Sequence, residues 1–143
     1  MTLHLLKLAV GIDTLSDLAA RQEQRWLDMA RDGVTPELIH LTRNMPRRGA
    51  EILGAGSLYW IIKGWITARQ TLLELRPVTR DGIAYCGMIY DRQIVPVATR
   101  PHRAFQGWRY LDAKNAPPDL TRQSHGADLP DALRRELVAL GLL

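Results

Sequence analysis

The sequence predicts an α+β fold: a mostly antiparallel, curved sheet or pseudo-barrel flanked by two to three helices. Three observations predict it. Residues 57–99 carry successive strand-like apolar runs, short turns join several of these runs, and helical apolar patterns stand before and after them. Because the 143 residues contain no internal repeat, low-complexity tract or linker, we expect one domain spanning 1–143.

The chain opens with a strand and a helix. Residues 3–10 have the apolar character of a strand, and Thr14 with Asp17 forms a capping box that predicts a helix over residues 15–31. The apolar positions of this segment fall mostly on one helical face, and Gly33 supplies the stop. A short strand at 38–42 follows.

The middle of the chain favours β structure. Pro46 suits the first position of a short helix over 47–53, after which strands are expected at 57–63, 66–78, 83–91 and 94–99. Asp81-Gly82 tolerates positive φ and therefore predicts a hairpin turn between the second and third of these strands.

The composition of the chain changes after residue 99. Residues 100–120, rich in Pro, Gly, Asn and aromatic residues, predict a long loop over the sheet with a short strand near 108–111. A polar stretch then leads to a helix expected at 130–140.

The charge distribution favours anionic partners. The formal net charge is +4, and the basic side chains divide into 16 Arg and 3 Lys. The planar guanidinium suits bidentate carboxylate or phosphate contacts and stacking on rings. Codon usage in a G+C-rich genome is an alternative explanation for the same bias.

No apolar run approaches the roughly 18 residues that a membrane span requires, so we expect no membrane association. The first residues lack the pattern of a signal peptide, which favours a cytoplasmic protein. The single cysteine, Cys86, lies in a strand-like run and is expected to be a small buried side chain rather than a nucleophile.

Two basic segments are candidate ligand sites. In residues 40–48 a strand end leads through a basic loop toward a helix N-terminus, an arrangement suited to phosphate, although Arg47 and Arg48 can equally pair with Glu51. In residues 100–110 arginines alternate with rings, as in pockets for single-stranded nucleic acid, although the rings can equally anchor a loop. The candidate phosphate-binding residues are Arg43, Arg47, Arg48, Arg69, Arg100, Arg103 and Arg109, and the candidate stacking residues are Trp108 and Tyr110.

Catalytic and metal chemistry have less support. The four histidines are scattered without metal-ligand spacing, and we find no phosphate-binding glycine loop, nucleophile elbow or paired carboxylates. We therefore expect no metal and no cofactor. His40 and His102 are the weak candidates for a general acid or base.

Three segments carry a resemblance to a known family: Gly56-Ser-Leu-Tyr-Trp-Ile-Ile-Lys-Gly64, His40-Leu-Thr-Arg43 and Phe105-Gln-Gly-Trp-Arg-Tyr-Leu111. With them the chain resembles the bacterial domain-of-unknown-function family DUF1489, over most of its length. This resemblance implies a compact bacterial protein and transfers no catalytic residue. In architecture the chain is also similar to the small pseudo-barrel RNA-binding domains of the PUA and ASCH groups, which is fold analogy alone.

The sequence therefore favours a binding module for RNA or a nucleotide, with the arginines and aromatic residues around one cleft. One alternative is a small enzyme that acts on a phosphorylated or anionic substrate through a histidine. Another is a protein-interaction domain that docks through the apolar end of the chain, residues 140–143.

Overall fold

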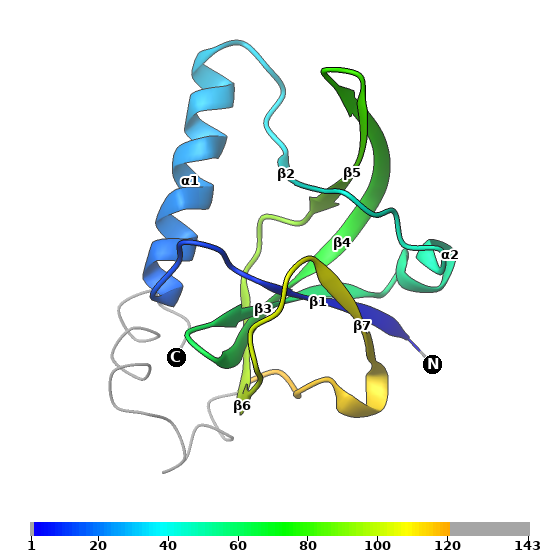
Figure 1. The fold of residues 1–143 in the computed structure, drawn as a ribbon. Coiled ribbons are helices and arrows are strands. Elements are labelled where there is room, and N and C mark those ends of the chain that lie inside the picture. The colour runs from blue at the N-terminus through cyan, green and yellow to red at the C-terminus, as the bar shows by residue number, and fades with distance from the viewer. Residues whose placement is uncertain (1, 121–143) are drawn as a thin grey trace.

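The computed structural model describes residues 2–120, and its centre is one long strand, β4 (Trp65–Arg80). The first half of β4 lies between β3 (Ser57–Ile62) and β6 (Val95–Pro101), and the second half pairs with β5 (Ile83–Tyr90). A register shift interrupts the pairing of β4 with each of its neighbours β3, β5 and β6, as expected where a sheet bends. Figure 1 shows the resulting curved ribbon.

The remaining strands extend this sheet on both sides. β2 (Leu38–Thr42) pairs with β5, while β1 (Leu3–Leu8) lies between β3 and β7 (Trp108–Asp112). Seven strands thus form one sheet in the order β2-β5-β4-β3-β1-β7, with β6 on β4. Of the pairings between described strands, only β1–β3 is parallel.

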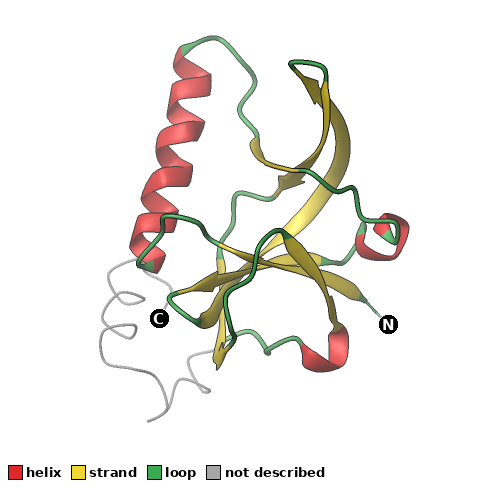
Figure 2. Ribbon diagram, in the orientation of Figure 1, coloured by secondary structure: helices red, strands yellow, loops and turns green. Residues whose placement is uncertain are grey.

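The α+β prediction is confirmed, and the pseudo-barrel alternative is wrong. The sheet is open and mixed, because β2 and β7 end the strand order without pairing with each other. Helix α1 (Leu15–Arg31) has the predicted bounds, and α2 (Gly49–Ile52) is shorter than the predicted helix. A 3-10 turn, η1 (Ala113–Asn115), follows β7 (Figure 2). The helix expected at 130–140 lies outside the described residues.

Local sequence signals explain several of these elements. The Thr14 hydroxyl accepts the backbone N–H of Asp17 at 3.0 Å, as the capping box predicts. Asp81 and Gly82 both have positive φ, +51° and +75°, as the predicted hairpin turn requires. Gly56 is buried where the backbone after α2 passes β1, and a Cβ there would collide with the carbonyl oxygens of Ile52 and Leu3.

Alternation along each strand divides the core into two clusters. On the first face Leu5, Leu58 and Trp60 pack with Leu15 and Leu18 of α1. On the second face the cluster contains Leu6, Tyr59, Ile61, Ile66, Val97 and Leu111, and the segments around Phe105 and Ala116 cover it. Cys86 is buried in the first cluster, where burial raises the pKa of its thiol, so the expectation of an inert side chain fits its position.

A buried amide network joins α1 to the sheet. Gln22 of α1 and Gln70 of β4 donate to each other at 2.8 and 2.7 Å. The Gln70 oxygen also accepts the Trp60 indole N–H at 2.9 Å, and the Gln70 amide also donates to the Asp91 carbonyl at 3.0 Å. Gln70 is fully buried, and both donors and both acceptor positions of its amide are used.

We predict that Gln70→Leu lowers the free energy of unfolding by about 2–4 kcal/mol, because the Trp60 N–H and the Gln22 amide would be left in the core without a hydrogen-bond partner. Urea denaturation measures the change. Gln24→Leu is the control, since Gln24 is exposed on the same helix and donates only to Asp28. Equal losses in the two variants would contradict a role for the network.

Candidate functional site

A pocket of about 190 Å³ opens between α1 and the first face of the sheet. Its lining comes from the end of β1 and the residues after it, from α1, and from β2, β3 and β5. Figure 1 shows where these elements lie. Its polar lining comes from Arg21 and Arg25 of α1, His40 of β2 and the ring-bearing residues Trp60 and Tyr90. The apolar lining is Leu8, Ala9, Val10, Ile12 and Leu18. We call this the α1 pocket.

Helix geometry aims two guanidinium groups at the pocket mouth. Arg21 and Arg25 are four residues apart and therefore share a face of α1. The Arg21 guanidinium donates to the Val10 carbonyl at 3.4 Å, whereas Arg25 has no ion pair within residues 2–120. Like charges at this spacing repel each other, so the free protein carries an electrostatic cost here.

A third cation lies next to the pocket inside the sheet. Lys7 of β1 is only 7% exposed, and its register partners are Trp60 on β3 and Trp108 on β7. Its ammonium donates to the Gly107 carbonyl at 3.4 Å and has no carboxylate partner among the described residues. Burial lowers the pKa of Lys7. A buried, unpaired ammonium is costly, and such groups concentrate at functional sites.

The surroundings of His40 lower the pKa of its imidazole. Its ring lies edge-on to Trp60, with 6.0 Å between the ring centroids. Desolvation, followed by the charges of Lys7 and Arg25, lowers the pKa of His40 to about 4. The imidazole is therefore neutral at pH 7. No Asp or Glu lines the pocket, so nothing there offsets the three cations.

The α1 pocket contains only one of the predicted site residues, His40. Sequence reasoning missed Lys7, Arg21 and Arg25, although a signal existed for each. Lys7 interrupts the apolar face formed by alternate residues of β1, and the two arginines stand at i and i+4 beside the apolar face of α1.

The structure brings part of the two predicted basic segments together. The Trp108 indole N–H donates to the Asn44 carbonyl at 2.8 Å, and the Arg48 backbone N–H donates to the Tyr110 hydroxyl at 3.1 Å. Trp108 and Tyr110 pack edge to face, with 4.9 Å between their centroids. The predicted stacking residues are therefore half-buried beside the 43–48 loop.

The other predicted arginines lie elsewhere. Arg100 donates to the Asn115 carbonyl, and Arg109 lies 4.2 Å from the Phe105 ring centroid, both in segments next to the second face. Arg103 is exposed in the loop between β6 and β7. Of the predicted arginines, only Arg48 lines either of the two pockets described within residues 2–120.

The Arg69 guanidinium is occupied by contacts that hold the fold together. It forms a bidentate ion pair with Asp119, with both N–O distances 2.7 Å, and also donates to the Ser57 hydroxyl at 3.0 Å. Since Asp119 bridges to Val97, this pair holds residues 116–120 against β6. His4 completes the cluster by accepting the Ser57 backbone N–H at 3.0 Å, and burial and Arg69 lower its pKa.

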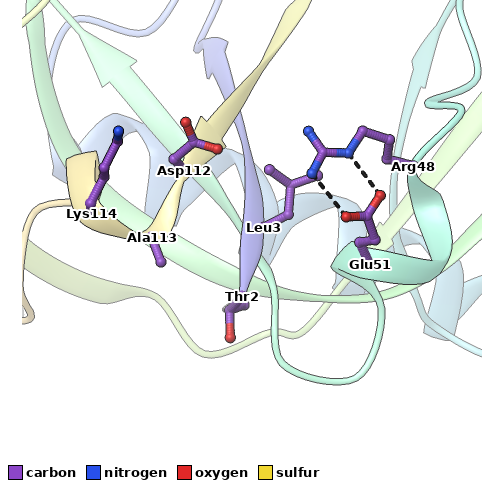
Figure 3. A pocket seen from close by; sticks show the side chains of 7 residues that line it. All are labelled: Thr2, Leu3, Arg48, Glu51, Asp112, Ala113 and Lys114. Atoms are coloured by element: carbon purple, nitrogen blue, oxygen red, sulfur yellow. Dashed lines mark hydrogen bonds and ion pairs between the residues drawn. The ribbon is translucent and has the colours of Figure 1, made fainter.

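Arg48 lines a second, larger depression of about 420 Å³ (Figure 3). There it forms two hydrogen bonds with Glu51, at 2.7 and 2.8 Å, which is the pairing left open by the sequence. Asp112 and Lys114 stand on the opposite side of the depression. Because its charges are mixed in sign and its arginine is already paired, this depression is a weaker candidate for an anionic ligand.

His102 and His40 contact different aromatic residues, Phe105 and Trp60. His102 lies directly after β6. Its Nδ1 lies 2.8 Å from the Arg103 carbonyl oxygen, and its ring packs on Phe105. Across residues 2–120, no three His, Cys, Asp or Glu side chains gather in a way that would hold a metal ion. In the same part of the chain, no helix is long and apolar enough to cross a membrane.

Comparison with known proteins gives one match. The model of a family described as "Protein of unknown function (DUF1489)" matches residues 5–143. The chain belongs to the DUF1489 family. No curated protein and no solved structure matches this DUF1489 chain.

We predict that stability falls between pH 6.5 and about pH 4 partly because of His40. In this window the unfolded imidazole binds a proton and the folded one does not, so protonation favours unfolding by at most about 3 kcal/mol. His40→Gln should flatten the decline, as measured by urea denaturation across pH. A His40 NMR titration midpoint near 6.5 would contradict the expectation.

We also predict that Lys7→Met raises the free energy of unfolding by about 1 kcal/mol at pH 7, because methionine fills the same space without a buried, unpaired charge. Thermal and urea denaturation measure the change. The exposed Lys63→Met is the control, since Lys63 pairs with Asp13 in solvent. A destabilised Lys7→Met protein would show that the ammonium supports the fold.

Proposed function

We propose that the protein is a binding module for a phosphate-bearing ligand of the nucleotide class, held in the α1 pocket. One observation carries the proposal: Arg21 and Arg25 line an aromatic pocket that has no acidic residue in its lining, and the buried Lys7 acts electrostatically on the pocket residue His40. Ligand pockets are typically concave and apolar with a few convergent polar groups. An anion between the guanidinium groups relieves their mutual repulsion.

Each group has a distinct role in this proposal. Arg21 and Arg25 bind phosphate oxygens at the mouth, while the buried Lys7 contributes positive potential from inside the sheet. Trp60 and Tyr90 offer ring surface, and the neutral His40 offers one donor and one acceptor. The Gln70 network fixes the Trp60 ring through its indole N–H.

An enzymatic role has less support from the same geometry. A general acid or base works best when its pKa lies near the working pH, and the pKa of His40 is about 4. The His102 ring lies against a backbone carbonyl and Phe105. The apolar end proposed for a protein partner, residues 140–143, lies outside the described residues.

We predict saturable binding of adenosine monophosphate, measured by isothermal titration calorimetry at pH 7 and low salt. Arg25→Ala should weaken binding about tenfold or more, because it removes a charge-assisted phosphate contact, typically worth about 1.5–3 kcal/mol. The control Arg31→Ala removes an exposed charge near the end of the same helix and should leave the affinity unchanged.

Inorganic phosphate and adenosine are parallel probes. Phosphate should compete with adenosine monophosphate, and adenosine should bind more weakly than the nucleotide. The absence of saturable binding by both phosphate and the nucleotide at millimolar concentration would refute the proposed function. So would equal effects of Arg25→Ala and Arg31→Ala.

A further inference from the structure

We infer that the ligand of the α1 pocket is one unit of a single-stranded polynucleotide, whose neighbouring nucleotides lie along the 43–48 loop. This inference rests on the proposed function and names its substrate class. It is carried by a surface that continues from the pocket, formed by Arg43, Arg47, Tyr85, Trp108 and Tyr110, which we call the aromatic strip.

The pocket and the aromatic strip are continuous in the fold. His40, which lines the pocket, stands three residues before Arg43, and Figure 1 shows the segment after β2 crossing toward α2. Lys7 provides a second link, because its register partners are Trp60 in the pocket and Trp108 in the strip. Neighbouring strands lie about 4.8 Å apart, so the two indoles stand on strands about 10 Å apart.

The size of the pocket argues for a ligand that extends beyond it. Pockets that enclose a whole small-molecule ligand usually measure about 300–1,000 Å³. The α1 pocket has about 190 Å³ and therefore accommodates one group of a nucleotide. The remaining parts of the ligand must leave through the mouth.

The strip supplies what a polynucleotide backbone requires. Arg43 and Arg47 are exposed and have no carboxylate partner within residues 2–120, in contrast to Arg48, Arg69 and Arg76, which are paired. The Arg43 guanidinium lies 5.6 Å from the Tyr85 ring centroid, which holds the cation in place. Trp108 and Tyr110 are half-buried aromatic residues beside it.

Stacking and phosphate attraction together give sequence-tolerant binding of single strands. The aromatic strip contains residues suited to each of these two interactions. Bases have the rings of Trp108 and Tyr110 as partners, and phosphates have Arg43 and Arg47. A longer strand therefore gains contacts that a mononucleotide cannot make.

The test compares a fluorescein-labelled hexaribonucleotide of mixed sequence with adenosine monophosphate as competitor, by fluorescence anisotropy. We expect the hexamer to bind at least tenfold more tightly than the mononucleotide. Arg43→Ala/Arg47→Ala should remove most of this advantage and leave mononucleotide affinity unchanged. For hexamer binding by this double variant, the slope of log K against log salt concentration should be smaller in magnitude than for the wild type. The expected difference is about 1.4, which corresponds to two lost phosphate contacts on a single strand.

Arg103→Ala/Arg109→Ala is the matched control, since it removes the same charge from the β6–β7 side of the molecule. It should bind the hexamer like the wild type. Trp108→Leu tests stacking, and its fold is checked by circular dichroism because Trp108 also donates to Asn44. A DNA hexamer that binds equally well supports the inference, because phosphates and bases are common to both strands.

The outcomes separate this inference from the proposed function. If the mononucleotide binds and the hexamer binds no more tightly, the inference is wrong and the proposed function stands. Equal losses in the two double variants also overturn it. If the hexamer binds but Arg25→Ala has no effect on it, the pocket is not part of the path and the inference is wrong, whereas the proposed function is decided by the effect of Arg25→Ala on mononucleotide binding.

Discussion

The amide of Gln70 is the contact on which the rest of the first face depends. It joins Gln22 of α1, which no strand pairing connects to the sheet, to the Trp60 indole on β3 and the Asp91 carbonyl after β5. Buried amides are tolerated only when all their hydrogen bonds are made, and here they are. Because hydrogen bonds are directional, the network sets the rotation of α1 as well as its distance from the sheet. That rotation directs Arg25 toward the α1 pocket, because Arg25 stands three positions after Gln22, and Arg21 shares the face of Arg25 because it stands four positions before it.

The α1 pocket and the neighbouring Lys7 hold positive charges that no carboxylate of the pocket lining offsets. Hydrophobic packing alone would fill position 7 with an apolar residue, as it does at Leu3, Leu5 and Ala9 on the same face of β1. The chain instead places an ammonium there, which donates to the Gly107 carbonyl and acts electrostatically on His40, without a carboxylate partner in residues 2–120. Natural proteins keep such unfavourable arrangements mainly where function requires them. The contrast with Arg69 is informative, because that guanidinium finds Asp119 and contributes to the fold instead.

Features that depend on neighbouring residues were predictable from the sequence. The capping box defined α1, the Asp81-Gly82 pair defined the β4–β5 turn, and apolar alternation located most strands. The parallel pairing of β1 with β3 was not predictable, because it joins segments about fifty residues apart through ordinary strand residues. The site was missed for a related reason. Clusters of arginine and aromatic residues drew attention to 40–48 and 100–110, whereas the α1 pocket combines Arg25 of α1 with His40 of β2, near Lys7 of β1, and these residues lie far apart in the sequence.

The position of β1 inside the sheet constrains how the protein is made. This strand leaves the ribosome before both of its partners, which are Leu58 to Ile61 on one side and Trp108 to Asp112 on the other. Until the chain has been extended past residue 112, the apolar residues of β1 lack their second neighbour. Contacts so distant in sequence slow folding and leave strand edges exposed during synthesis. The buried ammonium of Lys7 then acquires a second role in the nascent chain, since a charge within an unpaired apolar strand opposes premature pairing with other chains.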